Sequence, residues 1–308
     1  MSIGRREFFG VAVSAPALAA IPTFAGVKTK KAAKWEIVYK TPHGKPNGLC
    51  LTDEGLWVQD QGPESWMSLV NPADGKLIRE FKVDVSAASG VCVDDENVMW
   101  VTSTHNSLIV SCSPADGKTI AKYWTPGAGR IYSLKGDPPA RSTKLQPAYP
   151  AEGAAGGGGR GRGGRGGRGL GAFGRGGGLP YGQMPLETQE GAGGTGAHGI
   201  IYKDGLLYYA CPPARHIFVI DRKSWVVQNM WPLPGNRPHD MIWDDKKETI
   251  WNPDSNWNAF FRFDAKTGQM LEKVQLDDDS PVIHGAKIIN GYMYCCDDVG
   301  WMWRFKWS

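Results

Sequence analysis

The sequence repeats one short pattern of residues, as Gly196-Ala197-His198-Gly199-Ile200, as Arg237-Pro238-His239-Asp240-Met241 and as Val282-Ile283-His284-Gly285-Ala286. The same form, with a different polar residue at its centre, occurs in Lys45-Pro46-Asn47-Gly48-Leu49 and in Ala87-Ala88-Ser89-Gly90-Val91. Each stretch opens a short apolar segment, which a polar turn separates from a second apolar segment. Alternating β-branched and aromatic residues between such turns predict short antiparallel strands.

A complete repeat has two further strands. A third strand, such as Phe260-Phe261-Arg262-Phe263, follows a longer polar loop, and a turn such as Pro72-Ala73-Asp74-Gly75 leads into a fourth. Four strands in a unit of about 40 residues are typical of a β-propeller blade. The spacing agrees, because His198 lies 41 residues before His239, which lies 45 residues before His284.

The sequence therefore predicts an all-β fold, a β-propeller with five recognisable four-stranded blades. Six blades are the alternative, if residues 127–195 contain a degenerate blade. The last repeat stops after its third strand, near Trp303, whereas the chain has an additional strand at Trp35–Tyr39. We expect this N-terminal strand to complete the last blade, because closure of the ring leaves no unpaired strand edge.

The first 25 residues are typical of an export signal. Arg5-Arg6 precede an apolar run from Val11 to Phe24, as in a twin-arginine (Tat) signal, with a general secretory signal as the alternative. The run is short and contains two prolines, so we expect no stable membrane span after cleavage. We expect 1–25 to be a signal peptide, 26–308 to be a single propeller domain, and the mature protein to be periplasmic or otherwise exported.

An insert at 127–195 separates the second and third repeats. Its Gly/Arg-rich part occupies about 140–195, and residues 156–178 are nearly all glycine and arginine. Such a composition cannot bury enough apolar surface to offset its ordering entropy, so a disordered surface loop is expected, with a nucleic-acid tether as the alternative. The signal contributes +1 and the insert's five arginines contribute +5 to the formal net charge of +4, which leaves about −2 for the remainder. This balance argues against nucleic-acid binding on the core.

The six cysteines form no C-x-x-C pair, so a thiolate metal site has little support. Several cysteines lie within apolar strand patterns, which favours buried free thiols over a disulfide framework. The sequence also contains no G-x-S-x-G, no P-loop and no dinucleotide-binding fingerprint.

Three histidines occupy equivalent positions, in the turn that leads into the innermost strand of each blade, called here the inner turn. In a propeller, the inner turns and the loops between second and third strands share one face, next to the axis. Neutral imidazoles around an axis can bind a divalent ion and leave an open position, so we predict a zinc, magnesium or calcium site at His198, His239 and His284.

We predict His239 and His284 as catalytic residues, acting through the metal or as a metal-free general base. Asn47 and Ser89 replace histidine in the other two blades, so such a metal would lie off the axis. The alternative is a structural role, in which a polar residue before glycine satisfies backbone groups of the turn.

Other side chains on this face are candidates for binding a substrate. Arg215 and Arg237 can hold an anionic group, and Trp257 can stack on a ring, with a solvated rim and blade packing as the alternatives. The full set of predicted substrate-binding residues is Asn47, Asp60, Arg215, Asp254, Trp257 and Asp297.

The inner turns at Ala197-His198-Gly199, Pro238-His239-Asp240 and Ile283-His284-Gly285 resemble those of the Vgb/SMP-30/NHL group of propellers, over about 35–126 and 196–308. The resemblance implies a propeller. Within the group, streptogramin B lyases are divalent-metal enzymes with a histidine base, and the related peptidyl-hydroxyglycine lyase holds zinc with three histidines. Only the three histidines carry over, and the acidic ligand set of the gluconolactonase branch is not apparent.

We therefore expect an exported, metal-assisted lyase or hydrolase that acts on a small cyclic or ester-like substrate at the mouth of the propeller channel. The alternative is a non-catalytic periplasmic propeller that binds a ligand or a protein partner. Catalysis requires the histidines to converge, whereas a scaffold does not, so their geometry distinguishes the two functions.

Overall fold

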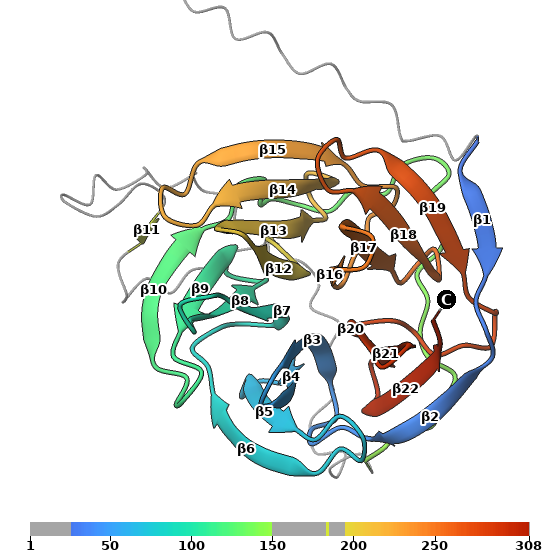
Figure 1. Ribbon diagram of the computed structural model, residues 1–308, viewed down its shortest axis with the longest axis horizontal. Coiled ribbons are helices and arrows are strands. Elements are labelled where there is room, and N and C mark those ends of the chain that lie inside the picture. Colours follow the sequence, from blue (N-terminus) through green and yellow to red (C-terminus); the bar gives the residue numbers. More distant parts are fainter. Residues whose placement is uncertain (1–25, 150–182, 185–194, 308) are drawn as a thin grey trace, which may run out of the picture.

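The computed structural model describes residues 26–149, 183–184 and 195–307. Five sheets form a ring in which each sheet is one blade (Figure 1). The predicted five-bladed propeller is confirmed, and the described part of the insert adds no sixth blade. The described residues also contain no helix that could cross a membrane.

The strands of each blade are numbered along the chain and run from the axis outward. Blade 1 contains β3 (Pro46–Thr52), β4 (Gly55–Asp60), β5 (Trp66–Val70) and β6 (Leu77–Lys82). Blade 2 contains β7 (Ala88–Val93), β8 (Met99–Ser103), β9 (Leu108–Cys112) and β10 (Thr119–Trp124), extended by β11 (Gln183–Met184). Blade 3 contains β12 (Ile200–Lys203), β13 (Leu206–Cys211), β14 (His216–Asp221) and β15 (Val227–Pro232).

The last two blades include strands from the N-terminal part of the chain. Blade 4 contains β16 (Ile242–Asp244), β17 (Thr249–Asp254), β18 (Ala259–Asp264) and β19 (Met270–Gln275), extended by β1 (Lys28–Lys31). Blade 5 contains β20 (Ala286–Ile289), β21 (Tyr292–Cys296), β22 (Trp301–Lys306) and, outermost, β2 (Trp35–Lys40).

Ring closure follows the prediction. Strand β2 pairs antiparallel with β22, with Trp35 opposite Phe305. Strand β1 was not predicted: it pairs parallel with β19, and Lys30 forms an ion pair with Glu272 at 2.6 Å. Because β1 and β2 lie on the outer edges of neighbouring blades, the N-terminal segment fastens blade 4 to blade 5 (Figure 1).

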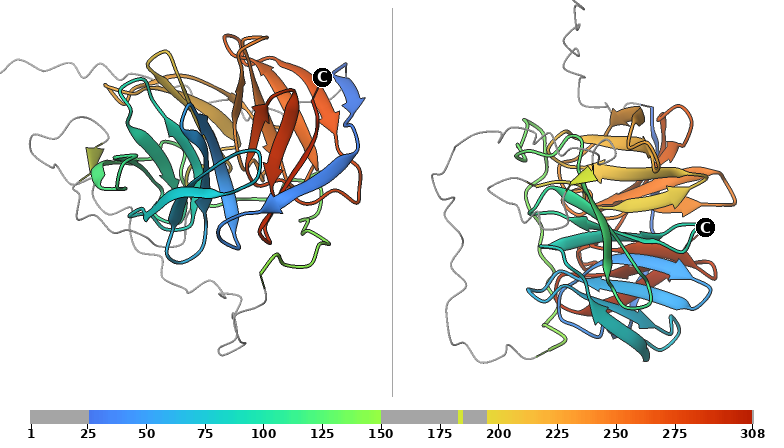
Figure 2. Two further views of the ribbon diagram at one scale, coloured as in Figure 1. Left: turned by 60° about the horizontal axis from the view of Figure 1, so that its bottom comes forward. Right: turned by 90° about the vertical axis from the view of Figure 1, so that its left-hand side faces the viewer.

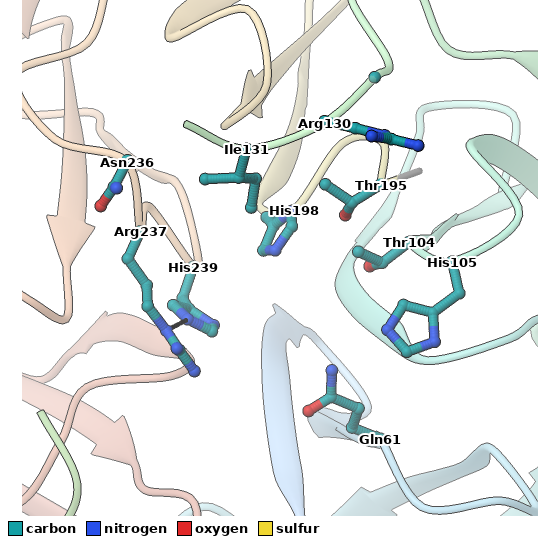
Figure 3. Close-up of a pocket in the computed structure, with 11 residues that line it drawn as sticks. Gln61, Thr104, His105, Arg130, Ile131, Thr195, His198, Asn236, Arg237 and His239 are labelled. Carbon is teal, nitrogen blue, oxygen red and sulfur yellow. Dashed lines mark hydrogen bonds between the residues drawn. The ribbon is translucent and has the colours of Figure 1, made fainter. Parts of the chain in front are cut away.

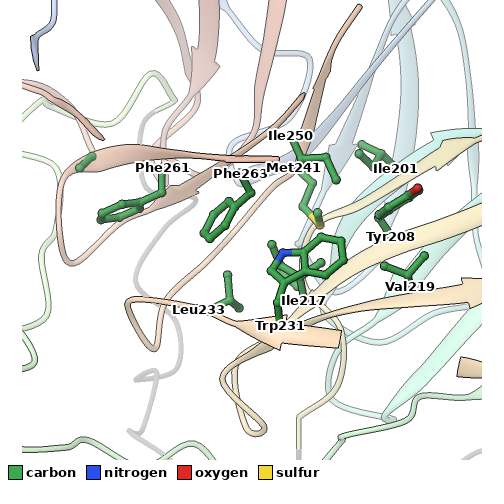
Figure 4. Packing of buried hydrophobic residues seen from close by; sticks show 12 residues of the cluster. Ile201, Tyr208, Ile217, Val219, Trp231, Leu233, Met241, Ile250, Phe261 and Phe263 are labelled. Atoms are coloured by element: carbon green, nitrogen blue, oxygen red, sulfur yellow. The ribbon is translucent and has the colours of Figure 1, made fainter. Parts of the chain in front are cut away.

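The hydrophobic core consists of five clusters, each between two adjacent blades. Between blades 3 and 4, the side chains of Tyr208 and Trp231 from one blade pack against those of Phe261 and Phe263 from the other (Figure 4). All six cysteines lie buried as free thiols, as the sequence favoured. This packing between blades fixes their inner turns relative to one another.

Around the axis, neighbouring blades approach to backbone contact. A Cβ on Gly90 would lie 2.2 Å from the carbonyl oxygen of His198, and a Cβ on Gly199 would lie 2.3 Å from the carbonyl carbon of Asp240, so only glycine fits. In blade 4 Asp240 takes the glycine's place, and its carboxylate accepts a hydrogen bond from the backbone N–H of Ala286 at 2.8 Å. Each histidine directly precedes such a position, and the close packing brings the three rings together.

Candidate functional site

A pocket of about 510 Å³ opens on the face that carries the inner turns (Figure 3). Its wall includes residues of four blades and of the insert, among them Gln61, Thr104, Arg130, Thr195, His198 and Arg237. No aspartate or glutamate is among the described residues that line it, so its formal charge comes from two arginines. The pocket is therefore suited to a polar, anionic ligand.

The three predicted histidines are neighbours. The ring centroids of His198 and His239 lie 5.5 Å apart with the planes at 84°, and those of His239 and His284 lie 4.4 Å apart with the planes at 3°. His239 and His284 are buried, whereas His198 is only partly buried. Of the three, His198 and His239 line the pocket, and His284 lies behind them.

Hydrogen bonds define the tautomers of two rings. Arg237 Nε donates to His239 Nε2 at 3.0 Å, so the proton of His239 is on Nδ1, which donates to Asn47 Oδ1 at 3.2 Å. His198 Nδ1 lies 3.2 Å from the carbonyl oxygen of Gly196 and must donate to it. The Nε2 of His198 therefore keeps its lone pair.

Burial keeps all three imidazoles neutral. Burial, with a smaller contribution from the Arg237 guanidinium, lowers the pKa of His198 to about 4 and that of His284 to about 3. The pKa of His239 lies well below its usual value because of burial, then because of His284 and Arg237. At neutral pH the rings are therefore lone-pair donors and carry no charge.

As arranged, the three histidines do not fit a metal. Both ring nitrogens of His239 are engaged, and the guanidinium of Arg237 lies beside its Nε2. The rings of His239 and His284 lie in nearly parallel planes, so their in-plane lone pairs cannot meet at one ion. In the described ranges, no group of three or more His, Cys, Asp or Glu side chains is placed to hold a metal ion. Metal binding at this site stays a prediction.

The carboxylates predicted to bind substrate make backbone hydrogen bonds instead. Asp60 accepts from the N–H of Lys45 at 2.8 Å and of Gly62 at 2.6 Å. Asp254 accepts from the N–H of Arg237 at 2.9 Å and from two N–H groups of its own loop, both at 3.0 Å. Each side chain ties the end of its blade's second strand to the adjacent inner turn.

Asp297 holds the corresponding loop of blade 5. Its Oδ1 accepts from the N–H of Val299 at 3.0 Å and of Trp301 at 2.8 Å, and burial raises its pKa to about 6. Its Oδ2 is buried without a partner in the described part of the chain. None of these aspartates is among the residues that line the pocket, and substrate contact by them stays a prediction.

The other residues predicted to bind substrate also make contacts with side chains of the protein. Asn47 is fully buried and accepts from Ser89 Oγ at 3.3 Å as well as from His239. Trp257 lies edge-on to Phe261, with ring centroids 6.5 Å apart. Arg215 forms two hydrogen bonds with Asp137, at 2.8 and 2.9 Å. Arg237, which the sequence suggested could hold an anionic group, does line the pocket.

Sequence reasoning missed the contribution of the insert. Its two ends pair with each other at Gly129 and Thr195, and this pairing brings Arg130, Ile131 and Thr195 into the pocket wall. The region around Arg130 resembles a strand in sequence, yet the structure has no strand at 130–149. Only its position could have indicated that the insert contributes to the pocket, because it begins and ends on the face of the inner turns.

No protein-family model matches the sequence, and no curated protein matches it. Among solved structures, Myxococcus xanthus glutaminyl cyclase superposes with a TM-score of 0.54 at 9% identity, covering 90% of this chain and 97% of that one. Virginiamycin B lyase from Staphylococcus aureus gives 0.44 at 14% identity, covering 89% and 99%. A streptogramin B lyase gives 0.43 at 16% identity, covering 90% and 98%.

The propeller fold that the resemblance implied is thus confirmed, and the cyclase, at a TM-score of 0.54, is a β-propeller enzyme. At such identities the likeness establishes the fold and does not extend to the chemistry of the site. The chain is a five-bladed β-propeller, similar in fold to the glutaminyl cyclase of Myxococcus xanthus.

Proposed function

We propose that this protein is a lyase or hydrolase that binds a small cyclic or ester-like substrate bearing a carboxylate in the pocket beside the histidines. The pairing of the Arg237 guanidinium with neutral His239, next to the open Nε2 of His198, carries the proposal. The Arg237 guanidinium, which can bind an anion, and His198 Nε2, which can accept a proton, then face the same small pocket.

Unused hydrogen-bonding groups of the pocket support a polar ligand. The hydroxyl oxygens of Thr104 and Thr195 are buried and lack a partner among the described residues. A buried hydroxyl without a partner is costly unless water or a ligand satisfies it. Because Arg237 uses Nε for His239, its two terminal amino groups are available for a carboxylate.

In the proposed lyase step, His198 Nε2 removes a proton from the carbon next to the substrate's carbonyl group. The C–H electron pair forms a carbon–carbon double bond, and the leaving group departs from the adjacent carbon with its own electron pair. Arg237 stabilises the negative charge that develops on the carboxylate group of the substrate. A bound anion also raises the pKa of His198, which makes the ring a stronger base while substrate is present.

Binding of simple carboxylates tests the proposal. Acetate, succinate and citrate serve as probes in calorimetric titrations, with uncharged succinamide as the ligand control. We expect the Arg237→Gln substitution to weaken carboxylate binding about 10- to 100-fold, the loss typical of a hydrogen bond to a charged group. The matched control is Arg79→Gln, which removes a guanidinium on outer strand β6 that pairs with Glu54.

Wild-type protein that binds none of the carboxylates would overturn the proposal. Tight binding without turnover, in a screen of cyclic and ester-like carboxylates, would favour the non-catalytic propeller that the sequence left as the alternative. Export is a further part of the proposal, supported by Arg5-Arg6 and the following apolar run. Fusion of residues 1–25 to a reporter, with and without an Arg5→Lys/Arg6→Lys change, tests it.

A further inference from the structure

One segment of the insert lies across the pocket face. Residues 130–149, named here the strap, leave blade 2 and run over blades 3 and 4 to blade 5 (Figure 2). The N–H of Arg141 donates to Asn256 Oδ1 at 3.4 Å in blade 4, and the N–H of Ala148 donates to the carbonyl oxygen of Val299 at 2.9 Å in blade 5. The strap therefore belongs to the folded domain, and its first residues form one wall of the pocket.

A buried ion pair fastens the strap beside the pocket. Arg215, in the loop after β13, donates from two nitrogens to both oxygens of Asp137, at 2.8 and 2.9 Å. The side chains are 14% and 5% exposed. Burial alone would raise the pKa of Asp137, but the bonds from Arg215 and from the N–H of Leu134 lower it. Asp137 is thus held as a carboxylate.

The same guanidinium also reaches the opposite wall. Arg215 donates to the carbonyl oxygen of Pro234 at 3.1 Å, three residues before Arg237. Asn236, between them, donates to the carbonyl oxygen of Tyr132 at 3.4 Å in the strap. One side chain therefore joins the wall that carries Arg130 to the wall that carries Arg237, and the two arginines approach the pocket from different sides (Figure 3).

Resting on the function proposed above, we infer that Arg215 is a positioning residue that fixes the spacing of Arg130 and Arg237, so that the pocket selects a substrate with two anionic groups. A dicarboxylate meets both guanidinium groups, and a monocarboxylate meets one. The role is distinct from the direct substrate contact predicted for Arg215 from the sequence, because both of its terminal nitrogens are already bound to the protein.

The measurement is the ratio of succinate affinity to butyrate affinity, two probes of similar length. We expect wild-type protein to prefer succinate at least about tenfold, as one additional charge-assisted contact implies. Arg215→Lys keeps the charge but cannot make the bidentate bond, and should bring the ratio near one while butyrate binding changes less than about threefold. Asp137→Asn should act in the same way, and the double variant should add little to either change.

Tyr149→Phe is the matched control, because it removes hydrogen bonds at the far end of the strap, to the carbonyl oxygens of Thr41 and Pro42. Its affinity ratio should equal that of wild type. An unchanged ratio in folded Asp137→Asn or Arg215→Lys protein would overturn the positioning role, even where Arg237→Gln weakens carboxylate binding as expected. Wild-type protein that binds neither probe would instead overturn the function on which the inference rests.

Discussion

Two sets of polar side chains on one face of the propeller differ in how their hydrogen bonds are used. Asp60 and Asp254 in the loops between second and third strands accept from backbone N–H groups through both oxygens. In the pocket, His198 Nε2 and the hydroxyls of Thr104 and Thr195 have no such partner in the described residues. The difference separates side chains that hold the loops from those available to a ligand, although both sets are polar and near the axis.

The largest effect is expected on the pocket side. Replacing His198 by Gln removes the proposed proton acceptor and should lower kcat about 10²- to 10⁴-fold, the usual contribution of a general base, with KM changed only a few-fold. Steady-state kinetics with a substrate from the carboxylate screen measures this. His216→Gln, on strand β14 outside the pocket wall, is the control. Full turnover by the His198 variant would show that His198 is not the proton acceptor.

On the loop side we expect loss of stability. Asp254→Ala leaves three backbone N–H groups without their acceptor, so the free energy of unfolding should fall by about 3 kcal/mol or more. Urea unfolding measures the change. The control, Asp245→Ala at an exposed turn, should stay within about 0.5 kcal/mol of wild type. Unchanged stability together with lost carboxylate binding would show that Asp254 acts on the ligand and not on the loop.

A third effect concerns the packing that brings the histidines together. Gly199→Ala places a Cβ 2.3 Å from the carbonyl carbon of Asp240, and the required shift should cost about 1–3 kcal/mol of stability. Gly44→Ala, whose Cβ would make an ordinary 3.5 Å contact with the Tyr149 ring, should cost much less. Thermal unfolding compares the two variants. Equal melting temperatures would show that the blades separate easily at the axis.

The smallest expected effect is a dependence on pH from His284, which lies buried behind the pocket. Its folded-state pKa is about 3, below the value of about 6.5 in an unfolded chain. Between these values the unfolded chain binds more protons, so stability rises with pH over this window and falls on acidification from pH 7 to 4. His284→Gln should reduce that acid loss by about 1–2 kcal/mol.

Denaturant unfolding at pH 7 and at pH 4 measures this loss of stability on acidification. The control is His43→Gln, at a half-buried position on the surface beside Glu80. An acid loss as large in the His284 variant as in wild type would mean that the ring is protonated in the folded state. That result would also change the interpretation of the stacked pair, because His239 would then lie against a cation.

Much of the fold and part of the site could be predicted from the repeat. A pattern that returns after 41 to 45 residues, except across the insert, indicates the blades, and equivalent positions in a closed ring must converge, as His198, His239 and His284 do. Strand β1 escaped prediction because Lys28–Lys31 contains no apolar residue and adds a fifth strand to a blade whose repeat already supplies four. The predicted substrate-binding set was chosen by residue type, which does not show whether a side chain's hydrogen bonds are already used.

The sequence by itself determined the blades, the closing strand and the shared face of the three histidines, because strand formation and turn geometry depend on nearby residues that recur in each repeat. The tertiary structure alone decided which polar groups remain free. Arg215 and Asp137 lie 78 residues apart, yet their ion pair fastens the strap beside the pocket and engages both terminal nitrogens of Arg215. Such pairings depend on how the blades and the strap pack, and no local pattern encodes them.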